Sequence, residues 1–104
     1  MMKFMNALTK IEQWYSSYCD GDWEHVFGIK IETLDNPGWM VKIDLLDTKL
    51  VNISFSEIIE ENGDDDWMRC RIRDSIFYGF GDPFKLEKIL VTFMNWVESN
   101  KKDS

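Results

Sequence analysis

The sequence predicts an α+β fold, an antiparallel sheet of about five strands flanked by N-terminal and C-terminal helices packed on one face. Two observations predict this fold class. Apolar residues recur at helical spacing near both ends of the chain, and they alternate with polar residues in short runs between. Each strand then has one apolar side and each helix one apolar stripe, so the other sheet face should be largely polar. A chain of 104 residues suits a single domain, residues 1–104.

A first helix is predicted at the start of the chain. Trp14 widens its apolar stripe, and Gly21 is a typical end signal just after a helix. The stripe consists of apolar residues at steps of three and four, namely Phe4, Leu8, Ile11, Tyr15 and Tyr18.

Two strands joined by a turn follow. Residues 27–31 and 39–45 both alternate between apolar and polar or small side chains. Between them, Pro37 suits the first central position of a turn, and Gly38 supplies the positive φ that a type II turn needs next. We therefore expect a hairpin here.

Three more strands are predicted in the second half of the chain. They cover residues 51–55, residues 68–73 and a segment near residues 76–80. Residues 57–66 contain six acids and no base, with a turn signal inside them, and are expected to form an acidic loop.

The last helix is expected to open at Asp82 and Pro83. Asp is a favourable N-cap residue, and Pro suits the first helical position. The apolar stripe of this helix contains Leu86, Ile89, Leu90, Phe93, Trp96 and Val97.

The acidic composition limits the classes of partner. The formal net charge of −7 repels nucleic acid and anionic membranes, and it favours fast association with a basic partner. The alternative is that the charge serves solubility alone. The chain has no apolar run of about 18 residues and no recognisable leader, so we expect a cytoplasmic protein with reduced thiols and no membrane partner.

The segment Cys19–His25 concentrates a thiol, several carboxylates and an imidazole. Its acids match the first, third and fifth positions of a calcium loop, but the sixth and twelfth positions hold His25 and Ile31 rather than Gly and Glu. A zinc site needs about four Cys or His ligands, or three with an open position. The Cys and His residues of the chain are Cys19, Cys70 and His25. We therefore expect no metal and no cofactor.

The sequence also argues against catalysis. His25 beside acids would suit a general base, but the chain lacks a nucleophile turn and a phosphate-binding glycine-rich loop. Cys70 precedes Arg71 and Arg73, which would suit an activated thiol for sulfur transfer. Strand alternation, however, places Cys70 on the apolar side and the arginines on the other. We expect a buried, inert thiol and no enzyme activity.

Three tryptophans stand at junctions of loops and strands, beside acids or turns. Aromatic anchors ringed by charge are typical of tight protein interfaces, whereas the alternative is that each indole packs at the edge of the core. If the two acidic loops lie at the same end of the sheet, they form one patch. The candidate binding residues are Asp20, Asp22, Trp23, Glu24, Trp39, Asp64, Asp65, Asp66 and Trp67.

Several stretches taken together carry a family resemblance. They are Trp14-Tyr15, Cys19–His25, Lys30–Trp39, Asp65–Trp67 and Gly79–Pro83. With these stretches the chain resembles the immunity protein 53 family of bacterial polymorphic toxin systems, from about residue 11 to residue 98. The resemblance implies a small cytoplasmic protein that protects its producer by binding a cognate toxin domain and blocking it, without a reaction of its own.

An acidic, aromatic-rich chain without a recognisable catalytic site agrees with that role. Toxins that attack nucleic acid carry basic clefts, so a basic nuclease is one candidate target, blocked by acidic loops that mimic phosphate charge. Two alternatives stay open. A general adaptor would bind through the polar sheet face, unless its cations form cross-strand ion pairs. A small enzyme would use His25 with a neighbouring acid. The cations of that face are Lys30, Lys42, Arg69, Arg71 and Arg73, offset by Glu32 and Asp44.

Overall fold

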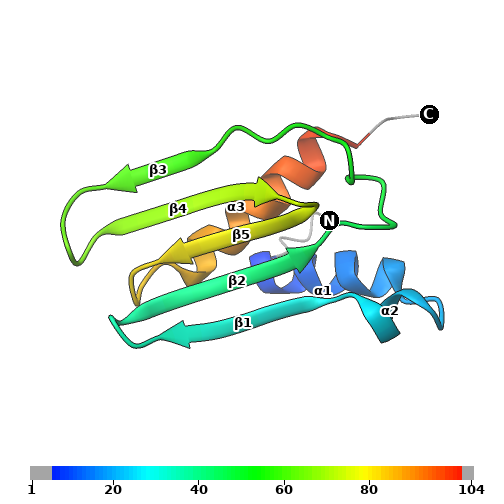
Figure 1. Ribbon diagram of the computed structural model, residues 1–104, viewed down its shortest axis with the longest axis horizontal. Helices are drawn as coiled ribbons and strands as arrows, with labels where there is room; N and C mark the ends of the chain where they lie inside the picture. Colours follow the sequence, from blue (N-terminus) through cyan, green and yellow to red (C-terminus); the bar gives the residue numbers. More distant parts are fainter. Residues whose placement is uncertain (1–5, 102–104) are drawn as a thin grey trace, which may run out of the picture.

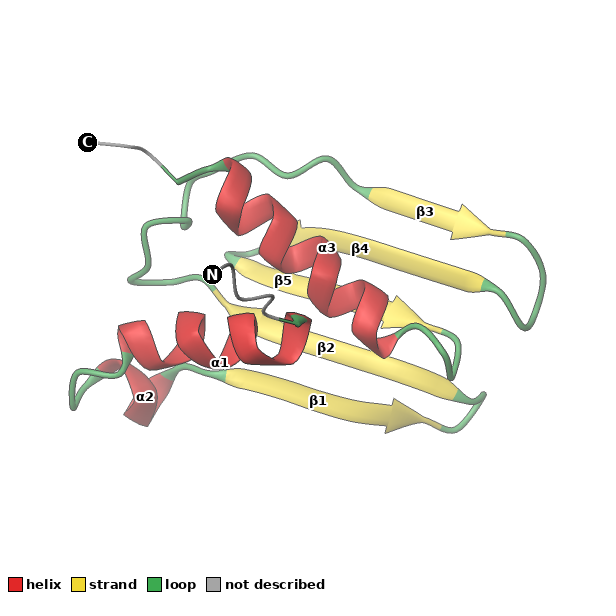
Figure 2. Ribbon diagram, turned by 180° about the vertical axis from the view of Figure 1, so that it is seen from behind, coloured by secondary structure: helices red, strands yellow, loops and turns green. Residues whose placement is uncertain are grey.

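The computed structural model describes residues 6–101, in which a five-stranded antiparallel sheet is covered by helices on one face (Figures 1 and 2). The fold class expected from the sequence is confirmed. The helices are α1 (Ala7–Tyr18), α2 (Trp23–Val26) and α3 (Leu86–Ser99). The strands are β1 (Ile29–Leu34), β2 (Gly38–Asp44), β3 (Ile58–Glu61), β4 (Trp67–Arg73) and β5 (Ile76–Gly81).

The strand order is β1-β2-β5-β4-β3, and every neighbouring pair is antiparallel. Residues 45–57 leave β2 and carry the chain past the ends of the central strands to β3 at the far edge (Figure 1). Figure 2 shows α1 and α3 side by side on one face, which leaves the opposite face uncovered. We call that uncovered side the open face.

The core lies between this sheet and the two long helices. Phe93 of α3 is fully buried, and its ring centroid lies 5.1 Å from that of Trp14 and 5.0 Å from that of Phe77. Cys70 is buried on the helix face, as the strand alternation predicts, and burial raises the pKa of its thiol to about 12. The expected stripe of α3 is confirmed, with Leu86 half-buried and the other five residues buried.

Gly79 lets α3 approach the centre of the sheet. A Cβ at this position would collide with the side chain of Ile89, which is itself fully buried. We expect Gly79→Ala to lower the free energy of unfolding by about 1–3 kcal/mol, because the tightly packed neighbours have to shift. Gly28→Ala is the matched control, since a Cβ there has no atom within 4 Å. Urea unfolding of both variants measures the difference, and equal effects would contradict this packing argument.

The strand expected at residues 51–55 is wrong. That segment has no strand structure, and residues 58–61 of the expected acidic loop pair with β4 instead. The alternation of apolar and polar residues in this segment has a different cause. The carbonyl oxygen of Ser54 accepts a hydrogen bond from Trp96 Nε1 at 2.9 Å, while the ring of Phe55 packs edge-on against Trp96 at 5.5 Å. The side chains of Val51, Ile53 and Phe55 are therefore half-buried while those of Asn52 and Ser54 are exposed, and Phe55 covers the end of α3.

The expected apolar stripe of α1 also needs correction. The buried face of α1 contains Ala7, Ile11 and Trp14, whereas Leu8 and Tyr15 are exposed. Packing against α3 decides this face, because Trp14 rather than Tyr15 meets Phe93. Phe4 lies outside the described residues.

The turns differ in detail from the sequence expectation. The hairpin of β1 and β2 is confirmed, but the Asn36–Pro37 bond is cis and Gly38 has no positive φ, so the type II turn is wrong. Glycine is required at position 38 for another reason, because a Cβ there would collide with the carbonyl oxygen of Gly81. The last helix begins at Leu86 rather than at Pro83, because Asp82 closes a separate turn before it.

Candidate functional site

The two acidic loops lie at opposite ends of the sheet. Asp20–Glu24 precede β1, whereas Asp64–Asp66 precede β4. The strand order makes β1 and β4 run in opposite directions, so their starting points face away from each other (Figure 1). The two loops therefore do not form one patch, and the predicted site residues divide into two groups.

The loop before β1 is held together by its own carboxylates. Asp20 Oδ1 accepts hydrogen bonds from the backbone N–H groups of Asp22 and Trp23, each at 3.0 Å. The Glu24 carboxylate accepts from the backbone N–H groups of Asp20 and Gly21. The N–H of Trp23, followed by that of Asp22, lowers the pKa of Asp20. These carboxylates shape the loop, and the side chain of Asp22 makes no capping hydrogen bond.

Trp23 belongs to the core. It is only 5% exposed, its ring lies 6.2 Å from Trp14 and 5.7 Å from Tyr18, and its Nε1 donates to the carbonyl oxygen of Leu46 at 3.0 Å. A side chain with so little free surface has almost no area to offer a partner in this conformation. Of the two sequence interpretations for Trp23, packing into the core is therefore the one that the structure shows.

His25 lies on the exposed surface of α2. Among residues 6–101 its imidazole forms no ion pair, and no group of three His, Cys, Asp or Glu side chains there has a geometry suited to a metal ion. The carboxylates of Asp20 and Glu24 accept backbone hydrogen bonds rather than bonds from this imidazole. The arrangement gives the imidazole no positioned partner for proton transfer.

The other predicted residues gather at the end of the sheet where β4 begins. Trp39 and Trp67 are both half-buried there. Trp39 Nε1 donates to the carbonyl oxygen of Pro83 at 2.9 Å, and the backbone N–H of Trp67 donates to Asp82 Oδ2 at 2.9 Å. Asp64, Asp65 and Asp66 are exposed in the turn just before Trp67.

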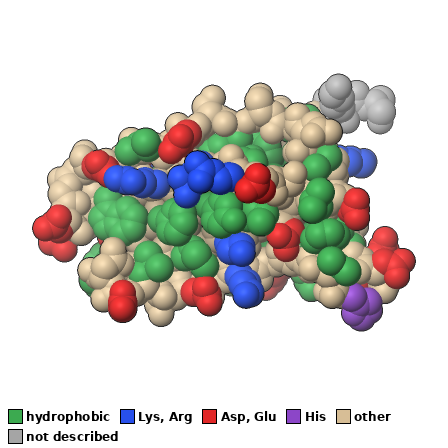
Figure 3. Space-filling view, in the orientation of Figure 1, with side chains coloured by type: hydrophobic (Ala, Val, Ile, Leu, Met, Phe, Trp, Pro, Cys, Tyr) green, Lys and Arg blue, Asp and Glu red, His purple; other side chains and the backbone are tan. Residues whose placement is uncertain are grey.

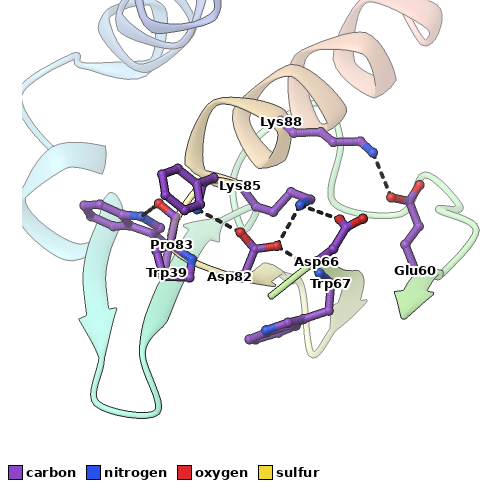
Figure 4. Close-up of polar contacts among 9 residues, drawn as sticks. Trp39, Glu60, Asp66, Trp67, Asp82, Pro83, Lys85 and Lys88 are labelled. Atoms are coloured by element: carbon purple, nitrogen blue, oxygen red, sulfur yellow. Dashed lines mark hydrogen bonds and ion pairs between the residues drawn. The ribbon is translucent and has the colours of Figure 1, made fainter. Parts of the chain in front are cut away.

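A buried carboxylate ties this end together (Figure 4). Asp82 is fully buried, and it accepts from Trp67 N, from Phe84 N at 2.8 Å and from Lys85 Nζ at 2.6 Å. Burial alone raises the pKa of Asp82, but the Lys85 ammonium and the backbone N–H groups outweigh it and hold the pKa at about 2. Lys85 Nζ also binds Asp66 Oδ1 at 2.7 Å, and hydrogen bonds to Asp66 and Asp82 raise its pKa.

Phe84 is the residue that the sequence reasoning missed. Its side chain is 88% exposed, although its backbone N–H is fixed on Asp82. The signal was present in the sequence, since an aromatic residue follows Asp-Pro between a strand and a helix. The expectation that the last helix starts at Pro83 placed Phe84 inside that helix and so hid its exposure. We call this end of the sheet, with Trp39, Asp64, Asp65, Asp66, Trp67 and Phe84, the acidic end; Trp39 lies on its helix side and Trp67 on its open face.

Two hollows adjoin Trp67. One of about 510 Å³ is lined by Asn36, Glu61, Gly63, Asp64 and Trp67. The other, about 450 Å³, lies on the open face. Trp67 lines both, so the acidic end is continuous with the open face.

Within residues 6–101, no helix combines the length and apolar character needed to cross a bilayer.

Comparison with known proteins identifies one family. The family model described as Immunity protein 53 matches residues 8–98, which is most of the chain. The search of curated proteins found no match, and neither did the search of solved structures.

Proposed function

The chain belongs to the immunity protein 53 family, and from this premise we propose that it binds a cognate toxin domain through the acidic end and blocks it. Family membership supports an immunity function, with a toxin as partner. The observation that carries the finer proposal is an 88% exposed Phe84 at the same sheet end as three exposed aspartates, with Asp82 binding the backbone of Phe84 and, through Lys85, connecting to Asp66. An apolar anchor with a charged rim is the arrangement that tight interfaces use.

The aspartates supply the electrostatic part of the proposal. Within the described residues, Asp66 pairs with Lys85, whereas Asp64 and Asp65 have no cation within 4 Å. Two unneutralised carboxylates on a protein of net charge −7 attract a basic surface and speed its approach. A toxin that binds phosphate has such a surface, so a basic nuclease remains our preferred class of target.

The aromatic side chains supply the apolar part. Phe84 is free to enter a pocket of the toxin, and the half-buried ring of Trp39, bonded to Pro83, provides rigid area next to it, while Trp67 adds aromatic area on the open face at the same sheet end. Trp39 is fixed by its bond to Pro83, so little side-chain entropy remains to be lost on binding. Blocking would be steric, which requires no reaction by the immunity protein itself. We place this binding in the cytoplasm of the bacterium that produces the toxin.

The first test identifies the toxin and then measures how fast it binds. Tagged protein captures partners from the producing cells, and the toxin domain found by mass spectrometry is purified for kinetics. Neutralising Asp64, Asp65 and Asp66 to asparagine should slow association about tenfold at low salt, with a smaller effect at high salt.

A variant with an equal change in net charge provides the control. It combines Glu12→Gln, Asp22→Asn and Asp47→Asn, three exposed acids outside the acidic end. If both variants slow association equally, overall charge alone attracts the toxin and the acidic end is not its site. Failure to capture any protein with a toxin domain, although such a protein is expressed, would contradict the proposed function itself.

A further inference from the structure

The open face carries a hollow lined by arginine and aromatic side chains, and we propose that it binds a carboxylate-bearing segment of the toxin, with the carboxylate on Arg71. This inference rests on the proposed function, because it names further chemistry of the same partner. The hollow has Trp67, Arg69, Arg71 and Phe80 among its lining residues, with Glu57 and Glu61 also at its border. We call it the arginine hollow.

The cations of the open face are mostly unpaired, contrary to the expected cross-strand ion pairs. Among the described residues, only Arg69 has a carboxylate partner there, Glu61. Asp44 Oδ2 accepts instead from the backbone N–H of Gly28 at 2.9 Å. Lys42 lies over the ring of Tyr78, with its Nζ 5.8 Å from the ring centroid. Among the described residues, Lys30, Lys42, Arg71 and Arg73 thus have no carboxylate partner and are available to an anion of a binding partner.

Arg71 is the group most in need of an acceptor. Its Nε is buried, and within residues 6–101 no protein atom accepts a hydrogen bond from it. A buried N–H without an acceptor is costly, and a planar guanidinium fits a carboxylate in a bidentate manner. Glu57 borders the same hollow but does not come within 4 Å of Arg71 to form an ion pair. Arg71 is half-buried and lines the hollow, so a carboxylate from outside that binds its guanidinium would reach Nε after a small rotation of this side chain.

Apolar surface lies directly beside these cations. Tyr78 and Phe80 are stacked along β5, with centroids 6.2 Å apart and an interplanar angle of 2°. Figure 3 shows a band of hydrophobic side chains next to a row of basic ones on this side of the molecule. The face expected to be largely polar is thus amphipathic. Its occupant should carry an aromatic or aliphatic side chain next to its carboxylate.

The position of the hollow identifies the toxin as the source of this segment. Trp67 belongs to both the acidic end and the arginine hollow, so a toxin that covers the first also reaches the second. A nucleic acid is a poorer occupant, because its many phosphates are repelled by the net charge of −7, whereas a single carboxylate has to fit only the guanidinium of Arg71. The toxin surface should therefore change from basic opposite Asp64–Asp66 to acidic opposite Arg71.

A peptide experiment tests the chemistry without the toxin. The full chain is titrated with the capped peptide Gly-Asp-Phe-Asp-Gly and, separately, with its amide counterpart Gly-Asn-Phe-Asn-Gly. NMR follows the Nε–H signal of Arg71 and the indole signal of Trp67. We expect the acidic peptide to shift both signals, and the amide peptide to bind at least tenfold more weakly. Equal shifts with both peptides, or none with the acidic one, would overturn the proposal.

A variant experiment then tests the toxin. Arg71→Gln should raise the dissociation constant of the captured toxin about 30-fold, mainly through faster dissociation. Arg73→Gln is the control on the same strand and face, because Arg73 is exposed and does not line the hollow; it should change affinity less than about threefold. Thermal unfolding of both variants checks that the fold is intact.

The outcomes separate the two proposals. If neutralising Asp64–Asp66 weakens binding but Arg71→Gln does not, the proposed function stands and this inference falls. If Arg71→Gln weakens binding while the aspartates have no effect, the inference stands and the acidic end is not the contact. Sedimentation of the free protein over a range of concentrations tests a second copy as occupant. If the free protein self-associates and Arg71→Gln abolishes this association, the occupant of the hollow is a second copy of the chain rather than the toxin.

Discussion

Replacing Phe84 with alanine is expected to weaken toxin binding about 30-fold, which corresponds to about 2 kcal/mol. The side chain is 88% exposed, so its removal creates no cavity in the free protein. Its position does not depend on the ring either, because the backbone N–H of Phe84 donates to Asp82. The folded protein should keep its stability while the interface loses its most exposed anchor.

Calorimetric titration with the captured toxin measures this loss, and thermal unfolding confirms the unchanged fold. Val26→Ala is the informative control. Val26 is 74% exposed and lies on α2, at the sheet end that carries Asp20–Glu24. The Val26→Ala variant should bind the toxin as tightly as the unmodified protein does. Weak binding by Val26→Ala together with normal binding by Phe84→Ala would place the interface at the α2 end instead.

Some features contained within one element could be predicted from the sequence, although the buried face of α1 could not. The apolar stripe of α3 and the buried position of Cys70 follow from periodicity alone, because a helix or a strand fixes which side chains share a side. For the same reason, the alternation of apolar and polar residues in 51–55 wrongly predicted a strand. An irregular segment that turns alternate side chains toward the core produces the same pattern as a strand.

The candidate site depended on relations between elements, and these could not be predicted. Whether the acidic loops adjoin is decided by strand order, since β1 and β4 must run in opposite directions in this sheet. The burial of Trp23 requires α1 and the segment after β2 to meet at its ring. The exposure of Phe84 follows from a turn around Asp82 that delays the start of α3. The first two relations join segments far apart in the sequence, whereas the turn around Asp82 is local and was missed because the helix was expected to begin at Pro83.

The acidic end also depends on the carboxylate of Asp82, which is fully buried. Asp82→Ala is expected to lower the free energy of unfolding by about 3 kcal/mol at neutral pH, because it leaves the ammonium of Lys85 and two backbone N–H groups without their buried acceptor. Asp66→Asn is the control. Asp66 is the exposed partner of Lys85, with its side chain 57% exposed, and its loss should change stability little. Similar losses in both variants would mean that Asp82 has no special role.

The same carboxylate makes the stability depend on pH in acid. The pKa of Asp82 in the fold is about 2, below its ordinary value of 3.8, so the folded state favours the ionised form. Its contribution is complete above about pH 4, and it is lost as the pH falls toward 2. Other carboxylates titrate in this range too, so the informative quantity is the stability difference between the unmodified protein and Asp82→Ala. Urea unfolding at several pH values should show that difference shrinking below pH 4. A difference that stays constant down to pH 2 would mean that shape, rather than the charge of Asp82, holds Trp67 and Phe84 in place.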